Sequence, residues 1–251
     1  MHEALCTASR RLAGALDGAR FERRDGYELL VFPMFPLPSF NGIWAETDAA
    51  AEDIESVRAE VKGMGLPFGV TVRENRTPAV EERARSLGLT TELRTPGMVV
   101  TPEELQLPDT ELEILRIKTA DGLAQALAVA ATGFEIPAEL LAALYLFEVA
   151  ELEGIEYYLA RLHERDVCTA IGYTVDDAVG IFNVATPPEF RRRGYGSIVT
   201  ANAIRAGFDA GADFAYLQSS SLGESVYRRL GFRQVDVYTI FMGGPEVSAT
   251  S

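Results

Sequence analysis

The alternation of apolar and polar residues along the chain predicts a mixed protein in which helices and strands follow one another. Apolar residues spaced three and four apart indicate helices, whereas short β-branched and aromatic runs indicate strands. In the first part of the chain, helices are expected at 3–16, 49–62 and 78–86, and strands at 27–32, 41–45, 68–73 and 91–100. The proline-rich segment 33–38 fits neither a helix interior nor a central strand.

The second part of the chain has a denser pattern. It predicts, in order, a strand, two helices, three strands, a helix, a strand, a helix and a final strand. The strands are expected at 112–118, 156–163, 167–174, 179–186, 214–218 and 232–242, and the helices at 121–132, 138–149, from 191–196 to Gly211, and at 224–230. Charged turns at 164–166 and 176–177 separate the three consecutive strands, as in an antiparallel meander.

A break in the pattern separates these two parts. Residues 101–109 hold two prolines and three acids and have no sustained period, which is typical of a linker. We therefore expect a first domain at 1–105, a linker at 106–111, a second domain at 112–245 and a short tail at 246–251. A length of 251 residues is sufficient for two domains of this kind.

Composition and charge narrow the class of protein. Hydrophobic residues make up 47% of the chain and charged residues 24%, which excludes a mainly disordered protein. The net charge of -14 makes nucleic acid and an anionic membrane surface poor partners, because both carry negative charge themselves. We expect neither as a partner. An amine-bearing ligand is easier to reconcile with this field, although the charge also serves solubility alone.

The cysteines and the N-terminal segment point to a cytoplasmic protein. Cys6 and Cys168 lie far apart, so no disulfide framework is expected. Residues 1–16 lack the pattern of a signal peptide, and the apolar run at 140–147 is too short to span a bilayer. A zinc site built from these cysteines with His2 and His163 is conceivable, but the spacings match no common zinc pattern. We expect no metal.

The strongest chemical signal lies between a strand and a helix, in Pro188-Glu-Phe-Arg-Arg-Arg-Gly194-Tyr-Gly196-Ser. Glycines let the backbone approach a phosphate closely, and the first amides of the following helix have no partners of their own. The helix dipole and three adjacent arginines add positive charge. The segment therefore predicts an anion-binding loop, and the alternative is a solvated basic turn before an ordinary helix.

Two other phosphate-binding motifs do not fit this segment. The Walker A motif needs a lysine after its last glycine, and the segment contains none. The dinucleotide-binding fingerprint needs a third glycine where Val199 stands, and it follows a parallel βαβ unit that a meander does not supply.

In this segment the chain resembles the GNAT (GCN5-related) N-acetyltransferase superfamily. Its acetyl-CoA loop reads Gln/Arg-x-x-Gly-x-Gly/Ala, which Arg191-Arg-Arg-Gly194-Tyr-Gly196 fits. A second family feature follows: a strand, then a short helix that carries Tyr227 and ends in Gly231-Phe232. The resemblance covers about 112–243. It implies an α+β (α/β) fold, the GNAT acyl-CoA N-acyltransferase fold, with a mixed, mostly antiparallel sheet flanked by helices.

The resemblance also implies roles for individual residues. The backbone of Val184 and Thr186 would pair with the pantetheine arm, and an amide there would polarise the thioester carbonyl. The pyrophosphate would lie on the loop, with Ser220 or Ser221 near a CoA contact where the family often has asparagine. Tyr227 would be the general acid for the departing thiolate, unless it is only a helix aromatic that packs on the core. The implied loop residues are Arg191, Arg192, Arg193, Gly194, Tyr195, Gly196 and Ser197.

A general base is not apparent. Many family members carry a glutamate on the strand before the loop, but the strand at 179–186 contains no acid. Four acids lie where the second helix meets the next strand, near the expected acceptor side, and most of them are expected to form a solvated turn. They are Glu148, Glu151, Glu153 and Glu156. No base is assigned.

The first part of the chain partly repeats the element order of the second. Its strand at 68–73, helix at 78–86 and strand at 91–100 echo the segment around Tyr227, but it has no Arg-x-x-Gly-x-Gly loop and no tyrosine in that helix. It resembles a degenerate GNAT-like half of a tandem protein that walls the acceptor cleft. The alternative is an unrelated α/β cap.

The resemblance implies an acetyl-CoA-dependent N-acetyltransferase. The amine of a small molecule or peptide would attack the thioester directly in a ternary complex, because neither cysteine lies in the loop motifs. The alternatives are a non-catalytic CoA-binding or interaction module and a transferase that uses another acyl group or a hydroxyl acceptor. A monomer and a homodimer are both compatible with the sequence.

Overall fold

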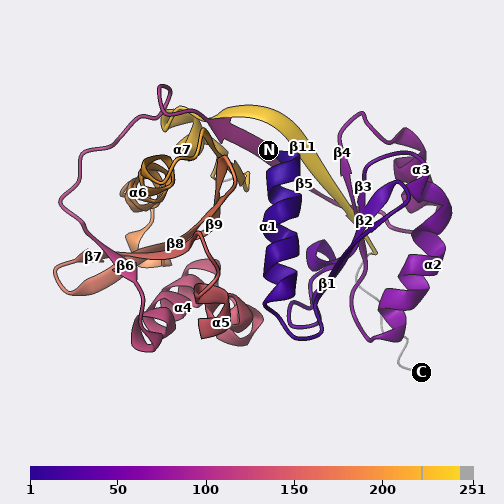
Figure 1. Ribbon diagram of the computed structural model, residues 1–251, viewed down its shortest axis with the longest axis horizontal. Helices are drawn as coiled ribbons and strands as arrows, with labels where there is room; N and C mark the ends of the chain where they lie inside the picture. Colours follow the sequence, from indigo (N-terminus) through magenta and orange to yellow (C-terminus); the bar gives the residue numbers. More distant parts are fainter. Residues whose placement is uncertain (222, 244–251) are drawn as a thin grey trace. The chain divides into compact units, whose positions relative to one another are not determined.

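Two groups of helices and strands form separate units, and each takes segments from distant parts of the chain (Figure 1). The structure is a computed structural model that describes residues 1–221 and 223–243. The larger unit contains Met1–Leu16 and Pro96–Val235, and the smaller unit contains Asp17–Thr95 and the chain from Asp236 onward. The tail expected at 246–251 lies outside the described residues.

The larger unit is built on a mixed sheet with the strand order β5-β10-β9-β8-β7-β6. β8 pairs antiparallel with β7 and with β9, which confirms the predicted meander, and β9 and β10 are parallel. The fold class expected from the resemblance is confirmed. The elements are α1 (His2–Gly14), β5 (Thr91–Val100), β6 (Glu113–Ile117), α4 (Ala120–Phe134), β7 (Ile155–Leu162), β8 (Arg165–Val175), β9 (Ala178–Ala185), α6 (Tyr195–Asp209), β10 (Phe214–Gln218) and α7 (Glu224–Arg229).

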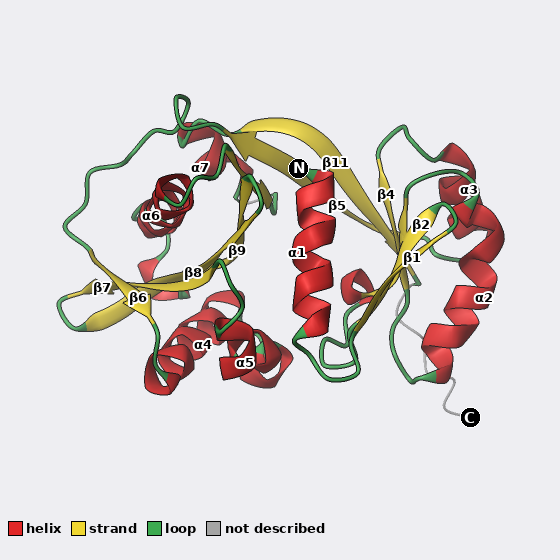
Figure 2. Ribbon diagram, viewed as in Figure 1, coloured by secondary structure: helices red, strands yellow, loops and turns green. Residues whose placement is uncertain are grey.

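Helices cover both faces of this sheet, as Figure 2 shows for α6 on one side and α4 on the other. Successive side chains of a strand point to opposite faces. Tyr158 and Ala160 of β7 accordingly pack in the core beneath α6, whereas Tyr157 and Leu159 pack in the core beneath α4. The central strands are therefore apolar throughout, which is why their sequence shows continuous runs.

The continuous helix predicted at 138–149 is wrong. The segment forms two 3-10 turns, η2 (Ala138–Leu140) and η3 (Ala142–Tyr145), and the short helix α5 (Phe147–Ala150). The backbone is extended at Leu146. This break lets Tyr145 enter the core at 6% exposure while Phe147 stays 50% exposed, so burial of one aromatic overrides the helical period.

The smaller unit has the strand order β1-β2-β3-β4-β11. Its elements are β1 (Arg20–Arg24), β2 (Tyr27–Val31), η1 (Pro38–Phe40), β3 (Asn41–Ala45), α2 (Ala50–Gly63), β4 (Gly69–Arg73), α3 (Pro78–Ser86) and β11 (Arg233–Met242). β1 was not predicted, because its charged sequence resembles a turn. Ion pairs of Glu60 with Arg20 (2.9 Å) and Arg24 (3.2 Å) hold this edge strand.

The two units share one pattern of strand pairing. In the larger unit β8 and β9 are antiparallel, β9 and β10 are parallel around α6, and β10 and β5 are antiparallel. In the smaller unit β2-β3, β3-β4 around α2, and β4-β11 repeat this order. The last strand of each unit comes from the other half of the chain.

The compact units consequently do not follow the predicted domain boundaries. The end of β5 (Gly97–Val100) pairs with β10 of the larger unit, and Tyr238–Met242 of β11 pair with β4 of the smaller unit. α1 also joins the larger unit, where Ala8 packs with Tyr173 and Val175 of β8. Reciprocal strand exchange leaves no sequence signal, because it changes partners without changing the periodicity.

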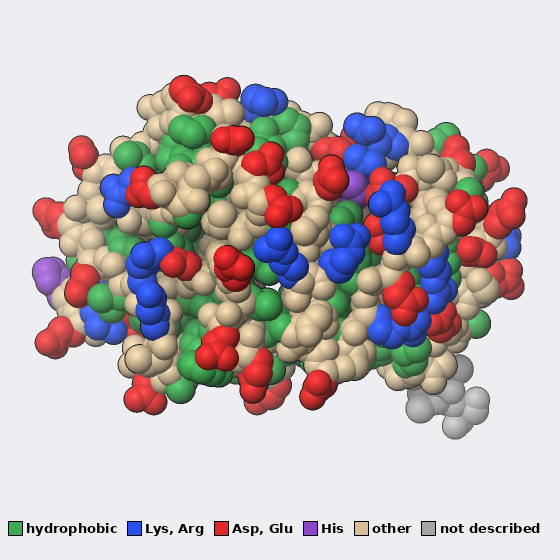
Figure 3. All heavy atoms as spheres, viewed as in Figure 1, with side chains coloured by type: hydrophobic (Ala, Val, Ile, Leu, Met, Phe, Trp, Pro, Cys, Tyr) green, Lys and Arg blue, Asp and Glu red, His purple; other side chains and the backbone are tan. Residues whose placement is uncertain are grey.

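The surface reflects the acidic composition. Asp and Glu side chains are distributed over the face shown in Figure 3, with Lys and Arg side chains among them. Across residues 1–221 and 223–243, none of the helices combines the length and the apolar character that crossing a bilayer requires.

Candidate functional site

The candidate site begins where two parallel strands separate. β9 pairs with β10 only through Ala178–Gly180, whereas the rest of β9 continues without β10 as a partner. Along its other edge, β10 pairs with β5 from Ala215 to Gln218. Three consecutive residues of β9 beyond the split, at 182–184, are only half-buried. The sheet therefore opens between β9 and β10 and exposes the backbone of β9.

A β-bulge lies in this exposed part of β9. Thr169 pairs with Ala185 and Ile171 with Phe182, so two residues of β9 oppose one residue of β8. Asn183, one of the two, has a φ of 51°, an uncommon conformation for a residue other than glycine. The Asn183 side-chain amide donates to the hydroxyl of buried Tyr145 at 3.4 Å. Backbone strain of this kind concentrates at functional sites.

The predicted anion-binding loop leads from this strand into α6. Arg192 and Gly194 both have left-handed backbone conformations, with φ of 62° and 81°. Amides in such alternating conformations form concave anion-binding nests. No side chain caps α6. The first backbone hydrogen bond of the helix runs from the Ile198 amide to the Gly194 carbonyl, at 3.1 Å. The amides of Tyr195, Gly196 and Ser197 are therefore available to an anion.

Gly196 brings the loop and the strand together. A Cβ placed on Gly196 would lie 3.7 Å from the Thr186 Oγ1 and 3.8 Å from the Val184 Cγ1. The end of β9 and the first turn of α6 thus face each other across a space that a larger side chain at 196 would fill. Val184, Thr186 and Gly196, which sequence reasoning grouped through the resemblance alone, are neighbours in the structure.

Arg191 has a different task from the other two arginines. Its guanidinium donates to the Thr186 carbonyl (3.2 Å) and the Gly133 carbonyl (2.8 Å), and it pairs with Glu135 (2.9 Å). It therefore ties the end of β9 to the end of α4. The Arg192 side chain makes no hydrogen bond or ion pair within the described chain, and Arg193 donates only to the Glu189 carbonyl.

Replacing Arg191 by alanine is expected to lower the free energy of unfolding by about 1–2 kcal/mol, because two backbone carbonyls lose a charged donor. Urea unfolding followed by circular dichroism measures this change. Arg205→Ala is the matched control, since Arg205 bonds only to the neighbouring Asn202 side chain, and its effect should stay within about 0.5 kcal/mol. Equal effects of the two variants would contradict the tying role.

The interior side of the site is formed by Cys168, Thr186 and Tyr227. The Thr186 hydroxyl donates to the Cys168 Sγ at 3.2 Å. Burial raises the pKa of the Cys168 thiol to about 12, so this thiol stays protonated at neutral pH and is a poor nucleophile. Burial, with the facing Cys168 as a second cause, also raises the pKa of Tyr227 to about 12.

Tyr227 and Ser220 converge at the start of α7. A Cβ on Gly223 would lie 3.0 Å from the Tyr227 ring and 3.4 Å from the Ser220 Oγ. The Tyr227 ring packs edge-on against Phe232 with centroids 5.8 Å apart, and its hydroxyl has no hydrogen-bond partner among the described residues. The Ser220 hydroxyl accepts from the Gly223 amide at 3.2 Å. Tyr227 therefore combines a packed ring with an uncommitted hydroxyl.

The four acids considered near the acceptor side have different environments. Glu148 lies in α5 and is exposed, and Glu151 follows it in an exposed turn. Glu153 and Glu156 line a cavity beside the later turns of α6. β9 itself carries Asn183 where an acid could have stood. The structure, like the sequence, assigns no general base.

Sequence reasoning missed three residues of this site. Asn183 creates the bulge, Cys168 supports Thr186, and Gly133 lets α4 approach β9, because a Cβ on Gly133 would lie 2.9 Å from the Thr186 amide nitrogen. Asn is enriched at left-handed positions, so Asn183 within an apolar strand was an available signal. The other two depend on contacts between distant segments.

A sheet that opens beside an uncapped helix start, with a glycine loop between them, defines the fold of the acyl-CoA N-acyltransferases. Residues 126–232 match the model of the acetyltransferase (GNAT) family. The match supports acetyl transfer as the general class of activity. No curated protein matches the sequence.

Several solved structures share the fold. A GCN5-related N-acetyltransferase from Kribbella flavida has a TM-score of 0.73 at 20% identity, covering 97% of this chain and 97% of that one. A functionally unknown conserved protein from Staphylococcus epidermidis has a TM-score of 0.67 at 15% identity, covering 90% and 94%. A putative GNAT-family acetyltransferase from Novosphingobium aromaticivorans has a TM-score of 0.57 at 17% identity, covering 89% and 91%. At these identities the likeness concerns the fold.

Proposed function

We propose that the protein is an acetyl-CoA-dependent N-acetyltransferase that acetylates the amine of a small molecule or peptide. The observation that carries the proposal is the convergence of three features in the larger unit: the opened edge of β9, the uncapped start of α6, and the Tyr227 hydroxyl. They are joined by Thr186, which faces both Gly196 and Cys168. The family match at 126–232 supports acetyl-CoA as the donor.

The residues present fit this donor. Its pyrophosphate would take the amides of 192–197, in a nest with free donors and the positive end of a fifteen-residue helix. Arg192 and Arg193 are exposed beside it and add positive charge in a chain of net charge -14. The backbone exposed at Val184 and Thr186 would pair with the pantetheine amides. Ser220 would contribute a hydroxyl from the start of α7.

The donor supplies an activated thioester, and the protein's own groups handle charge and protons around it. A backbone amide at the bulge would stabilise negative charge on the carbonyl oxygen. Tyr227 would hold a proton for the departing sulfur. With a pKa of about 12, donation to a thiolate of pKa about 8.5 is uphill by roughly 3.5 units, or about 5 kcal/mol, unless the bound donor changes the surroundings of the hydroxyl.

The acceptor amine must either bind in its neutral form or lose a proton in the site. An alkylamine of pKa about 10.4 costs about 4.6 kcal/mol to deprotonate at pH 7. Asn183 lies at the bulge, and its amide accepts a hydrogen bond but takes no proton. We therefore infer a water-mediated deprotonation or an acceptor with a lowered pKa, and direct attack without a covalent enzyme intermediate.

The smaller unit is proposed to be a degenerate GNAT-like half. Its support is the repeated strand pairing around α2, in the order found around α6. At the position of the anion-binding loop it has Glu46-Thr-Asp48, and Asp48 accepts from the Ala79 amide at 2.8 Å. An acidic turn of this kind repels phosphate, so one donor site per chain is proposed.

Calorimetry with acetyl-CoA, followed by a thiol-release assay on a panel of amines, tests the proposal. Saturable binding and amine-dependent release of free CoA are expected. Incubation with acetyl-CoA alone should leave the intact mass of the protein without an acetyl adduct, because the Cys168 thiol is buried and protonated. Absence of acetyl-CoA binding would overturn the proposal, and binding without turnover on any amine would favour a CoA-binding module.

A further inference from the structure

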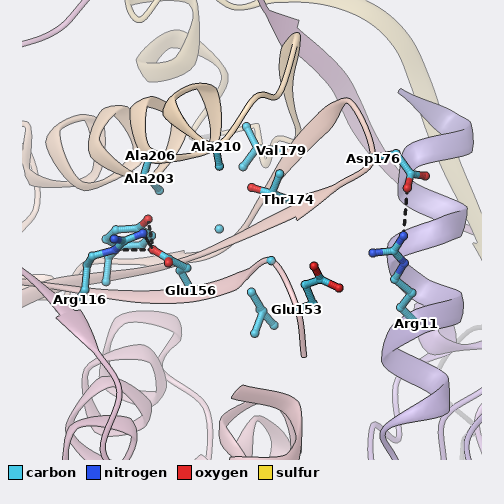
Figure 4. Close-up of a pocket in the computed structure, with 15 residues that line it drawn as sticks. Arg11, Arg116, Glu153, Glu156, Thr174, Asp176, Val179, Ala203, Ala206 and Ala210 are labelled. Carbon is cyan, nitrogen blue, oxygen red and sulfur yellow. Dashed lines mark hydrogen bonds and ion pairs between the residues drawn. The ribbon is translucent and has the colours of Figure 1, made fainter. Parts of the chain in front are cut away.

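A cavity of the larger unit lies away from the candidate donor site. It measures about 390 Å³ and is bounded by the later turns of α6, the sheet face of β7 and β8, and α1 (Figure 4). Small residues leave this space open: Ala203 and Ala206 of α6, and Ala210 directly after it, stand where longer side chains would fill it. Its volume falls within the range of small-molecule pockets.

Two ion pairs occupy opposite ends of the cavity. Arg116 of β6 pairs with Glu156 of β7, and the Tyr158 hydroxyl also donates to Glu156 at 2.9 Å. Arg11 of α1 pairs with Asp176 at 3.0 Å. Figure 4 shows these pairs on the two sides of the space. Both arginines are therefore already neutralised and offer little net attraction to an anion.

Glu153 is the unmatched charge of the cavity. It lies between the two ion pairs in Figure 4 and makes no hydrogen bond or ion pair within the described chain. The lining charges are thus two arginines against three acids, a net charge of minus one. Opposite Glu153 the wall is apolar, formed by Val179 and the alanines of α6. A single carboxylate facing an aliphatic wall favours a ligand with one cationic end and one apolar end.

We propose that this cavity binds a small organic ammonium compound, with the ammonium group at Glu153 and the aliphatic part against Ala203 and Ala206. The site is built from two kinds of observation that agree, a cavity of defined volume and one carboxylate left over between satisfied pairs. An ammonium group compensates the charge of Glu153 and can also donate to the free lone pairs of Glu156, whereas a neutral head group compensates no charge and an anionic one is repelled.

The position of the cavity separates it from the donor site. Gly207 of α6 packs on Val179, at the start of β9, whereas Gly196 faces Val184 near its end. These two glycines are eleven residues apart on one helix, about 16 Å along its axis. A ligand in the cavity therefore binds independently of the loop at 192–197. This inference can be tested separately from the proposed function.

Hexylammonium, with hexanol and hexanoate as its neutral and anionic counterparts, is the probe. Titration of protein labelled at alanine methyl groups, followed by NMR, should give saturable shifts of Ala203, Ala206 and Ala210. Hexylammonium is expected to bind at least about tenfold more tightly than either counterpart. Acetyl-CoA at saturation should leave the affinity within about twofold.

Two variants and one control make the assignment specific. Glu153→Gln is expected to weaken hexylammonium at least about tenfold, whereas Glu151→Gln, the same change in a nearby exposed residue that does not line the cavity, should leave it unchanged. Ala206→Leu should abolish the shifts by filling the space. Glu153 is exposed, so its replacement leaves folding intact even if Ala206→Leu does not.

Equal affinity for hexanol would overturn the ammonium assignment. Equal affinity of the Glu153→Gln variant, or shifts confined to alanines elsewhere, would overturn the site. Loss of hexylammonium binding on addition of acetyl-CoA would place the amine at the donor site instead, which contradicts this inference and leaves the proposed function standing.

Discussion

Replacing Tyr227 by phenylalanine is expected to lower the turnover number of acetyl transfer by about tenfold or more, with acetyl-CoA affinity within about twofold of the parent. The ring would keep its packing against Phe232 and Gly223, because the change removes only the hydroxyl. That hydroxyl has no partner in the described chain, so its loss leaves no other group unsatisfied. A large effect on turnover would therefore reflect chemistry and not folding.

The raised pKa of Tyr227 gives this prediction a pH signature. The protonated hydroxyl is the form that donates, and it persists until the pH approaches a pKa of about 12. Turnover of the parent enzyme should show no fall assignable to this tyrosine below about pH 10. The unfolded state ionises near pH 10, so stability associated with this group is fully present below that pH and is lost as the pH rises toward 12.

Tyr27→Phe is the control for loss of a tyrosine hydroxyl away from the site, since Tyr27 belongs to the core of the smaller unit and its hydroxyl bonds to Arg24 and Asp53. Steady-state kinetics on the best amine of the panel, with calorimetry for acetyl-CoA, measure both variants. Unchanged turnover in Tyr227→Phe would remove Tyr227 from the mechanism and leave it as a packing residue.

Replacing Gly196 by glutamate should weaken acetyl-CoA binding by at least about a hundredfold. The side chain would extend from a Cβ only 3.7 Å from the Thr186 hydroxyl into the space between β9 and α6. Its carboxylate would then meet the amides of 195–197 and compete with the pyrophosphate, and the two negative charges would repel. Alanine at the same position makes only ordinary contacts and should produce a smaller loss.

Gly63→Glu makes the same chemical change at the exposed end of α2, where a Cβ meets no atom within 4 Å. It should leave acetyl-CoA affinity unchanged and lower stability by less than about 1 kcal/mol, because an acid at a helix C-terminus is mildly unfavourable. Isothermal titration of both variants, with thermal unfolding to verify the fold, measures the difference. Full acetyl-CoA affinity in Gly196→Glu would rule out the loop as the pyrophosphate site.

The periodic parts of the fold could be predicted from the sequence, because a buried face repeats with the geometry of its element. The meander from β7 to β9 and the helix after the glycine loop are of this kind. The segment at 138–149 could not, since burial of Tyr145 overrides its local period. β1 was missed because its three arginines and one glutamate show no apolar alternation, and its partners β2 and Glu60 are set by the fold.

Only the part of the site that is formed by residues close together in the sequence could be predicted. Gly194 is informative because its backbone is left-handed, and Gly196 because a larger side chain there would fill the space between β9 and α6. The task of Arg191 was not predicted: nothing in three consecutive arginines indicates that the first reaches the Gly133 carbonyl. The proximity of Cys168 to Thr186 likewise depends on the pairing of β8 with β9.

The exchange of β5 and β11 between the halves of the chain constrains the order in which the protein can fold during synthesis. β4 obtains its antiparallel neighbour only from Tyr238–Met242, close to the end of the chain. Most of the smaller unit is synthesised before β11. Its sheet therefore has an unpaired edge at β4 until β11 has been synthesised. Such an edge invites pairing with other chains, and Arg73, which lies opposite Tyr238 of β11, is the charged residue of β4 that would discourage it.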